Sequence, residues 1–387
     1  MATNKKQSTE AAVREISRPP IHRSFSTGAL VVSCACISFA AGGCGAPTLD
    51  DRLITYRELV EQVVGARPMS STDSAEDVGL PRRRVRRIDV ADRRINGFDF
   101  LAIQGCALSE HIGARNNPTG RTMVPSRRLL YELEVLEDAA ACIAGLSDGR
   151  ADKIQRIIQE KQRERSVHVW NAVWLGEEME AYLAGALPPF GRATDRAEPL
   201  GAAEMLAVLR RPVRLPSDAV ALEEALAGLR GAYPNGAMLR SLQKAAWELA
   251  EVAALLESQP PASRCSGDSE RLANVFRAQF VALQPDLARL GRDAATRLET
   301  LALVFDATTE SLARVPPAMQ QYRRRMLDPD SPEALLPRYV RAVKRHAFAW
   351  QPIADRCGLV PTASPGSAEL PDSRGSVPLH SLSLSAN

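Results

Sequence analysis

A single cysteine placed directly behind an apolar run limits what the rest of this 387-residue chain folds into. The run covers residues 28–41, and Cys44 follows it after two glycines. The residues before the run carry five basic side chains, Lys5, Lys6, Arg14, Arg18 and Arg23. A basic region, a short apolar region and small residues before a cut are typical of a secretory signal, and a cysteine just after the cut is typical of the bacterial lipoprotein type. We therefore expect residues 1–43 to be removed, Cys44 to be acylated, and the remainder to fold in an oxidising compartment.

Three alternatives to this interpretation stay open. A buried apolar segment with a chance cysteine would leave Cys44 unmodified. An uncleaved membrane span is disfavoured, because about 14 apolar residues fall short of the roughly 20 that a bilayer core requires. A cytosolic helical protein with a misread start would have reduced cysteines and no acyl group.

The charge balance of the chain agrees with removal of residues 1–43. The whole sequence has 49 Lys and Arg against 46 Asp and Glu. Residues 1–43 hold five of the basic and two of the acidic side chains, so 44 of each remain from Cys44 onward. Proteins that bind nucleic acid normally keep a positive excess that displaces counterions from the phosphates. A nucleic-acid partner is therefore disfavoured.

Four further cysteines remain after Cys44, namely Cys106, Cys142, Cys265 and Cys357. In an exported chain they indicate two disulfides, for which three connectivities exist. We favour Cys106–Cys142, between neighbouring helices, and Cys265–Cys357, which would hold the last helix against the body. Their wide spacing does not match the clustered cysteines of zinc sites. Four buried free thiols are the alternative.

Apolar spacing predicts an all-α, multi-helix bundle-like domain over residues 44–360. A short extended segment near 81–96 and a disordered C-terminal tail over 361–387 complete the prediction. The segment 186–216, richer in Pro and Gly, marks a possible division into subdomains. Helices are expected from Thr48 to before Pro68 and near 97–115, 126–146, 152–174, 177–185, 201–210, 217–230, 235–258, 268–311 and 332–356. Pro285 is expected to kink or break the helix over 268–311.

The two helices over 97–115 and 126–146 are predicted to form an antiparallel hairpin. Cys106 lies about 10 residues before the connecting loop and Cys142 about 16 residues after it, which leaves an offset of roughly 9 Å at 1.5 Å per residue. The connection must therefore fold over the second helix if these cysteines are to pair.

The polar loop between these helices is a candidate anion or ligand site. A helix that begins near Ser126 offers free N–H groups and a positive dipole end to a carboxylate or phosphate. The alternative is a loop held by its own hydrogen bonds, with its arginines paired to Glu132 or Glu134. The candidate residues are Arg115, Asn116, Asn117, Arg121, Ser126, Arg127 and Arg128.

Trp170 and Trp174 are four residues apart and share one face of a helix, with Asn171 beside them. They are candidates for an aromatic platform that stacks on a sugar ring, and core packing is the favoured alternative. The arginine-rich residues 82–94 could contact anionic lipid head groups or form a solvated face balanced by Asp89 and Asp92.

No catalytic residue, metal ligand or cofactor-binding motif is predicted. His111, His168 and His346 do not have the spacing of H-E-x-x-H or a comparable metal motif. A glycosidase pair of carboxylates is left open, because such groups are recognised by their separation in space.

Several stretches of the chain form a pattern: Cys44, residues 98–106, 115–117, 120–121 and 125–133, Cys142, and residues 170–174 and 356–358. This pattern resembles a Gram-negative envelope lipoprotein family whose defining domain has no assigned function. The resemblance implies an exported, helical, lipid-anchored protein, and it transfers no active site.

We therefore expect a lipid-anchored periplasmic protein, most readily a non-enzymatic binding or assembly factor of the cell envelope. Its expected partners are the membrane, through the acyl anchor, and an envelope protein. Gly45 follows Cys44 where an Asp would favour the inner membrane, so the expected location is the outer membrane, facing the periplasm. The competing hypothesis is a hydrolase or ligand-binding protein that acts on cell-wall glycan or lipid.

Overall fold

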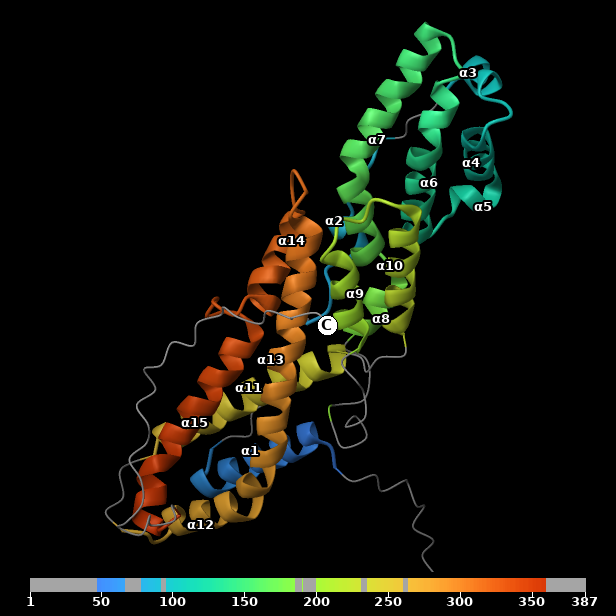
Figure 1. The fold of residues 1–387 in the computed structure, drawn as a ribbon. Coiled ribbons are helices and arrows are strands. Elements are labelled where there is room, and N and C mark those ends of the chain that lie inside the picture. Colours follow the sequence, from blue (N-terminus) through green and yellow to red (C-terminus); the bar gives the residue numbers. More distant parts are fainter. Residues whose placement is uncertain are drawn as a thin grey trace, which may run out of the picture. The chain divides into compact units, whose positions relative to one another are not determined.

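Helices make up the regular structure throughout the described part of the chain, as the apolar spacing predicts (Figure 1). The computed structural model describes residues 47–66, 78–91, 95–184, 190, 200–230, 235–259 and 264–359. From Pro47 onward these residues belong to one compact unit. The predicted signal with Cys44 and the tail over 361–387 lie outside the described residues. So do residues 186–189 and 191–199 of the predicted division at 186–216.

The helices divide among an N-terminal, a central and a C-terminal group. The first are α1 (Leu49–Val64), α2 (Arg83–Arg86), α3 (Gly97–Ala102), α4 (Ala107–Asn116), α5 (Pro118–Arg121), α6 (Pro125–Ile143), α7 (Asp148–Trp174) and α8 (Glu177–Leu183). The central ones are α9 (Leu200–Leu209), α10 (Pro216–Gly228) and α11 (Asn235–Glu257). The last are α12 (Asp268–Val275), α13 (Val281–Thr309), α14 (Pro317–Tyr322) and α15 (Leu335–Cys357), with π-helical segments η3 (Phe276–Phe280) and η4 (Arg323–Leu327). Within the described ranges, none of these helices has the length and apolar character needed to span a bilayer.

Three predicted segments differ from the structure. The helix expected over 97–115 is broken after α3, where Gly105 has a φ of 90° that favours glycine. The helix expected over 268–311 is continuous through Pro285, and its irregularity is the π turn η3 just before that residue. The extended segment near 81–96 contains one helical turn, α2, between irregular residues.

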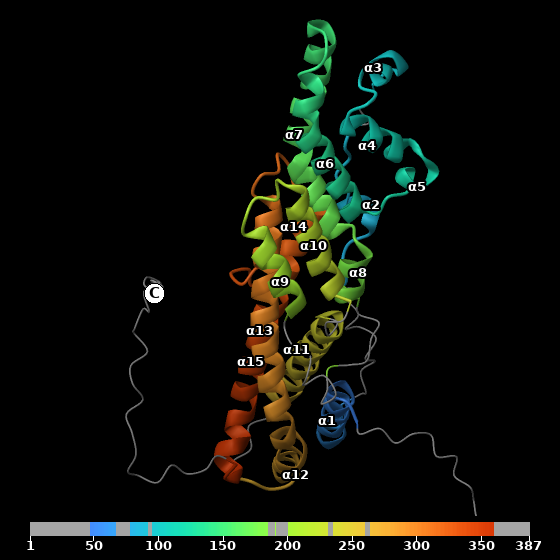
Figure 2. The ribbon, with the colours of Figure 1, turned by 45° about the vertical axis from the view of Figure 1, so that its right-hand side comes forward.

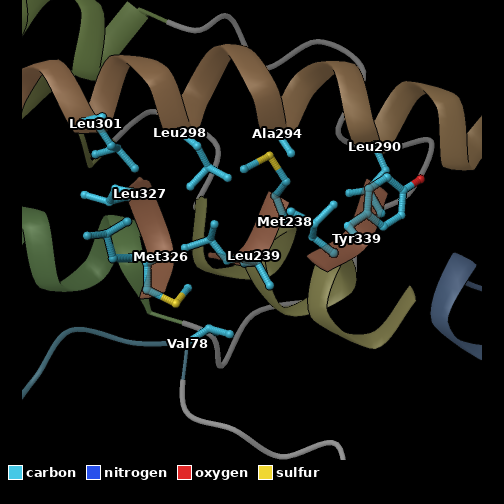
Figure 3. Close-up of a cluster of buried hydrophobic side chains, with 14 of the residues drawn as sticks. Val78, Met238, Leu239, Leu290, Ala294, Leu298, Leu301, Met326, Leu327 and Tyr339 are labelled. Atoms are coloured by element: carbon cyan, nitrogen blue, oxygen red, sulfur yellow. The ribbon is translucent and has the colours of Figure 1, made fainter. Parts of the chain in front are cut away.

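The main core forms around α13, which packs against α9, α11 and α15. Four residues on one face of α13 repeat at helical spacing and point into this core (Figure 3). They are Leu290, Ala294, Leu298 and Leu301. Facing them in the same close-up are Met238 and Leu239 of α11, Met326 and Leu327 of η4, and Tyr339 of α15. Helices far apart in the sequence therefore share one apolar interior.

A second, smaller apolar cluster joins α6 and the first half of α7 to the α3–α4 region. The pair α6 and α7 lie side by side and antiparallel in both views (Figures 1 and 2). The cluster consists of Ile103, Leu108, Tyr131, Val135, Ala139, Cys142, Ile154 and Ile158. Members of this cluster line the candidate site described below.

Both favoured disulfide pairings are confirmed. The Cα atoms of Cys106 and Cys142 are 5.8 Å apart, and those of Cys265 and Cys357 are 5.0 Å apart. The first bond joins the start of α4 to the end of α6. The expected offset between these helices is taken up by α5, a helical turn inside the connection from α4 to α6.

A buried polar cluster of three aromatic side chains links α1 to α15. The Tyr56 hydroxyl lies 2.9 Å from Nε2 of His346, and Nε1 of Trp350 donates to the Tyr56 hydroxyl at 2.8 Å. Burial lowers the pKa of His346 to about 3, because a charged imidazolium would be desolvated there. The folded protein therefore keeps this imidazole neutral.

This buried imidazole predicts a specific acid sensitivity. The unfolded chain protonates His346 near pH 6.5 and the folded chain only near pH 3, so stability is complete above pH 6.5 and is lost as the pH falls toward 3. The loss is about 1.4 kcal/mol per pH unit from this residue. His346→Gln should remove that slope from the free energy of unfolding, measured by urea titration between pH 6 and pH 4. Wild type and variant should respond equally to pH between 7 and 8, and a slope unchanged below pH 6 would contradict the prediction.

Candidate functional site

A cavity of about 650 Å³ lies among α4, α5, α6 and α7, with residues 87–91 along one side. Its walls include members of the second apolar cluster and several residues of the predicted polar loop. The described lining residues combine aliphatic side chains with cationic ones. The cavity is therefore where the predicted anion site is to be compared with the structure.

Residues 87–91 are held against α7 by paired hydrogen bonds to one side chain. Nδ2 of Asn171 donates to the carbonyl of Ile88 at 2.8 Å, and the Ile88 N–H donates to Oδ1 of Asn171 at 3.2 Å. Nε1 of Trp170 donates to the Arg86 carbonyl at 2.9 Å. The buried Arg86 guanidinium in turn donates to the Trp174 carbonyl and to Glu180. This side of the cavity is thus fixed by residues one turn apart on α7.

The wall made by α4 and α5 depends on a close backbone approach. Oδ1 of Asn117 accepts from the Gly120 N–H at 2.6 Å and so caps α5. A Cβ atom at Gly120 would lie 2.1 Å from the Ala114 carbonyl oxygen, a distance that no side chain can occupy. The Arg115 guanidinium donates through Nη1 to the Gly120 carbonyl, whereas its buried Nε has no hydrogen-bond partner among the described residues. The Arg115 side chain is therefore fixed to α5 at the cavity wall.

A buried carboxylate holds two of the lining cations in place. Nζ of Lys161 donates to Oε2 of Glu132 at 2.5 Å, and Nη2 of Arg128 lies 2.5 Å from Oε1 of the same group as an ion pair. Burial by itself raises the pKa of Glu132, but the charges of Lys161 and Arg128 outweigh it, so the pKa lies below its ordinary value. One negative charge is thus shared by two positive ones, which leaves a net positive charge at this level of the cavity.

Tyr131 and His168 complete this end of the cavity. The Arg128 guanidinium lies 5.1 Å from the centre of the Tyr131 ring, and burial raises the pKa of that phenol to about 12. His168 is 5% exposed, and its burial lowers the pKa to about 4 despite the nearby Glu132 charge. Both groups are therefore neutral at physiological pH and offer hydrogen bonds without adding charge.

The two ends of the cavity differ in character. The Glu132–Lys161 pair fixes the register of the antiparallel α6 and α7, so residues after 132 face residues before 161. Val135 accordingly clusters with Ile154 and Ile158. The cationic Arg128 lies near the start of α6 together with the apolar Met123 and Pro125, whereas the lining residues toward the Cys106–Cys142 disulfide are aliphatic. The cavity therefore has one end where cationic and apolar side chains mix and one end that is apolar.

Five of the predicted anion-site residues line this cavity: Arg115, Asn116, Arg121, Arg128 and Asn171. Three further residues of the loop do not line it. Asn117 caps α5, Ser126 is half-buried in the first turn of α6, and Nε of Arg127 pairs with Glu223 of α10 at 3.0 Å. Arg128 pairs with Glu132, as the alternative expects, and anion binding by the lining residues stays a prediction.

The aromatic platform at Trp170 and Trp174 is wrong. Both side chains are 0% exposed and pack edge-on against Phe305 of α13. Nε1 of Trp174 donates to the Thr308 hydroxyl at 2.9 Å. Neither ring face is open to a sugar, so core packing is the role of this pair.

The sequence pattern does not assign the lining residues Arg87, Tyr131, Lys161 or His168 to the anion site. Arg87 is considered there only within the arginine-rich residues 82–94, and His168 only as a metal ligand. Lys161 and His168 lie seven residues apart on α7 and therefore on one face of it, which is the one signal that could have grouped them. Their connection with Arg128 appears only once α6 and α7 are placed together. Among the described residues, no group of three or more His, Cys, Asp and Glu is arranged to hold a metal ion.

Residues 145–149 have the spacing G-x-S-x-G, which can mark a nucleophilic serine. That role requires a strand before the serine and a helix after it. Here the helix α6 precedes the segment, and exposed Ser147 is the residue before α7. The structural context of a nucleophile elbow is therefore missing at this serine.

The close approach at Gly120 predicts a local loss of stability on substitution. Gly120→Ala should lower the free energy of unfolding by about 1–3 kcal/mol, since the added methyl group meets backbone atoms that cannot yield. Gly113→Ala is the matched control on α4, because nothing lies within 4 Å of its Cβ position. The control should be neutral or gain up to about 1 kcal/mol from helix propensity. Urea unfolding with unchanged m-values would measure both, and equal midpoints for the two variants would contradict the prediction.

Comparison with known proteins identifies a family but no characterised relative. No curated protein and no solved structure matches the chain. One family matches residues 54–361, which include every helix from α2 to α15 and all residues of the cavity wall. The chain belongs to this family, which is described as "Protein of unknown function (DUF3080)".

Proposed function

We propose that this chain is a non-enzymatic binding protein of the cell envelope, and that its ligand is a small molecule with an acidic group and an apolar part. The observation that carries the proposal is the composition of the cavity wall. Among the described lining residues, the cations Arg87, Arg115, Arg121, Arg128 and Lys161 stand against the carboxylate of Asp89. They adjoin an aliphatic surface that includes Ile154 and Ile158.

The chemistry of the wall supports an acidic ligand. Guanidinium groups present several N–H donors in one plane, which suits carboxylate, phosphate and sulfonate oxygens. At about 650 Å³ the cavity lies within the 300–1,000 Å³ range typical of small-molecule sites. Within the described ranges, Arg115 and Arg121 line the wall without a carboxylate partner, whereas Arg128 and Lys161 share Glu132.

The proposed location follows from the residues around Cys44. The basic region, the apolar run over 28–41 and the cysteine after two glycines favour export and acylation. The two disulfides are consistent with an oxidising compartment. Gly45 at the following position favours the outer membrane, with the domain facing the periplasm.

A fluorescent apolar anion tests the binding function. The probe 8-anilinonaphthalene-1-sulfonate should bind the folded protein saturably at one site. The double variant Arg115→Gln/Arg121→Gln should weaken this binding by about tenfold or more, because two charge-assisted contacts are lost.

The matched control is Arg127→Gln, one residue before Arg128 but paired with Glu223 outside the cavity. It should bind the probe as the wild type does. Near-ultraviolet circular dichroism should be the same for all three proteins, which excludes binding to a loosened core. The absence of saturable binding, or an equal loss in the control, would reject the proposed function.

Acylation is tested separately at Cys44. Cells expressing the wild type should incorporate labelled palmitate into this chain and retain it in the outer-membrane fraction. Cys44→Ser should take up no label, because the thioether cannot form. Unlabelled wild-type protein in the soluble fraction would contradict the proposed location without affecting the cavity.

A further inference from the structure

A simple inorganic anion would leave the apolar end of the cavity unfilled. An inorganic phosphate or sulfate would occupy only the end near Arg115 and Arg128. The opposite end is lined by Ile103, Leu108, Val135, Ile154, Ile157 and Ile158, whose side chains offer no hydrogen bonds. Water in such a place lacks the two to four polar partners that hold buried water. An apolar group of a ligand would therefore suit this end better than water does.

The two ends lie along one axis. From Lys161 to Ile154 on α7 the distance is seven residues, or about 10 Å at 1.5 Å per residue. The same direction on α6 leads from Arg128 past Val135 toward Cys142 at the disulfide. An elongated molecule along this axis would place one end among cations and the other among aliphatic side chains.

We infer that the cavity holds a single-chain amphiphile, with its oxyanion head group between Arg115, Arg128 and Lys161 and its alkyl chain directed toward the Cys106–Cys142 disulfide. The inference rests on the binding function proposed above and adds the ligand class and its orientation. The shared chemistry is an oxyanion on an alkyl chain, whether it is released from a membrane lipid or present as a free acid.

The polar groups around the head support this orientation. Arg115 contributes its guanidinium charge, and Glu132 holds Arg128 and Lys161 together. His168, held neutral, lies two turns beyond Lys161 on α7, on the side away from Ile154. The buried Tyr131 phenol is also neutral. Asp89 is the lining carboxylate in the described wall, and it lies on the segment beside Asn171 rather than at the aliphatic end.

A series of alkyl phosphates tests the inference. The full chain carrying Cys44→Ser lacks the acylation site and can be titrated without detergent, with each probe kept below its micelle concentration. Affinity should rise about fourfold per added methylene, and then stop rising once the chain exceeds the apolar end. Inorganic phosphate should bind at least a hundredfold more weakly than the best alkyl phosphate, and the matching alkyl alcohols should bind at least tenfold more weakly.

Two variants separate the head from the chain. Arg115→Gln should lower the affinity for every alkyl phosphate by a similar factor of about ten, and it should leave the dependence of affinity on chain length unchanged. Ile157→Gln, at a half-buried position in the apolar wall, should flatten the chain-length dependence and leave phosphate binding as it is. Arg127→Gln should change neither, and the melting temperatures of the variants show whether they are folded.

The outcomes distinguish this inference from the function on which it rests. If the naphthalene sulfonate binds but inorganic phosphate equals dodecyl phosphate, the amphiphile is rejected and an anion-binding function stands. If the alcohols bind as well as the phosphates, the head-group assignment is rejected. Equal affinity for lysophosphatidic acid and alkyl phosphate supports a lipid source, while binding of the alkyl phosphates alone supports a free amphiphile. If no probe binds saturably, both proposals fall.

Discussion

The charge cluster at Glu132 sets the geometry on which the rest of this region depends. A carboxylate that is 3% exposed is stable as an anion only because Lys161 and Arg128 both reach it. The contact joins α6 to α7 and so fixes which residues of the two helices face each other. The aliphatic cluster around Val135 and the cationic end around Arg128 follow from that register. The two ion pairs of Glu132 thus fix where Arg128 and Lys161 lie relative to the aliphatic residues of the cavity.

Much of the fold could be predicted from apolar spacing, because a long amphipathic helix repeats its apolar residues at helical spacing over several turns. The helix expected over 235–258 is α11, and the capping box at Thr48 and Asp51 starts α1. Short helices were not predicted, because a single turn such as α2 is too short to show a repeat of apolar residues. The break after α3 depends on one backbone angle at Gly105. Pro285 lies inside the continuous helix α13, against its low helix propensity, and the π turn η3 precedes that helix.

The candidate site could be predicted only where its residues are close in sequence. Arg115, Arg121 and Arg128 were grouped because one loop carries them. Lys161 and His168 come from another helix, and only tertiary packing brings them to the same wall. The prediction of an aromatic platform at the tryptophan pair was wrong for a different reason. Two indoles four residues apart look identical whether their shared face meets a ligand or, as at Phe305, another helix.

The bond between Cys106 and Cys142 shapes the cavity, and the time at which it forms depends on export. It fastens α4, which supplies Leu108 and Ile112 to the wall, to the far end of α6. Under the proposed export, these thiols meet an oxidant only after translocation. A newly made chain would then cross the inner membrane with α4 not yet bonded to α6, and this wall of the cavity would be completed only after export.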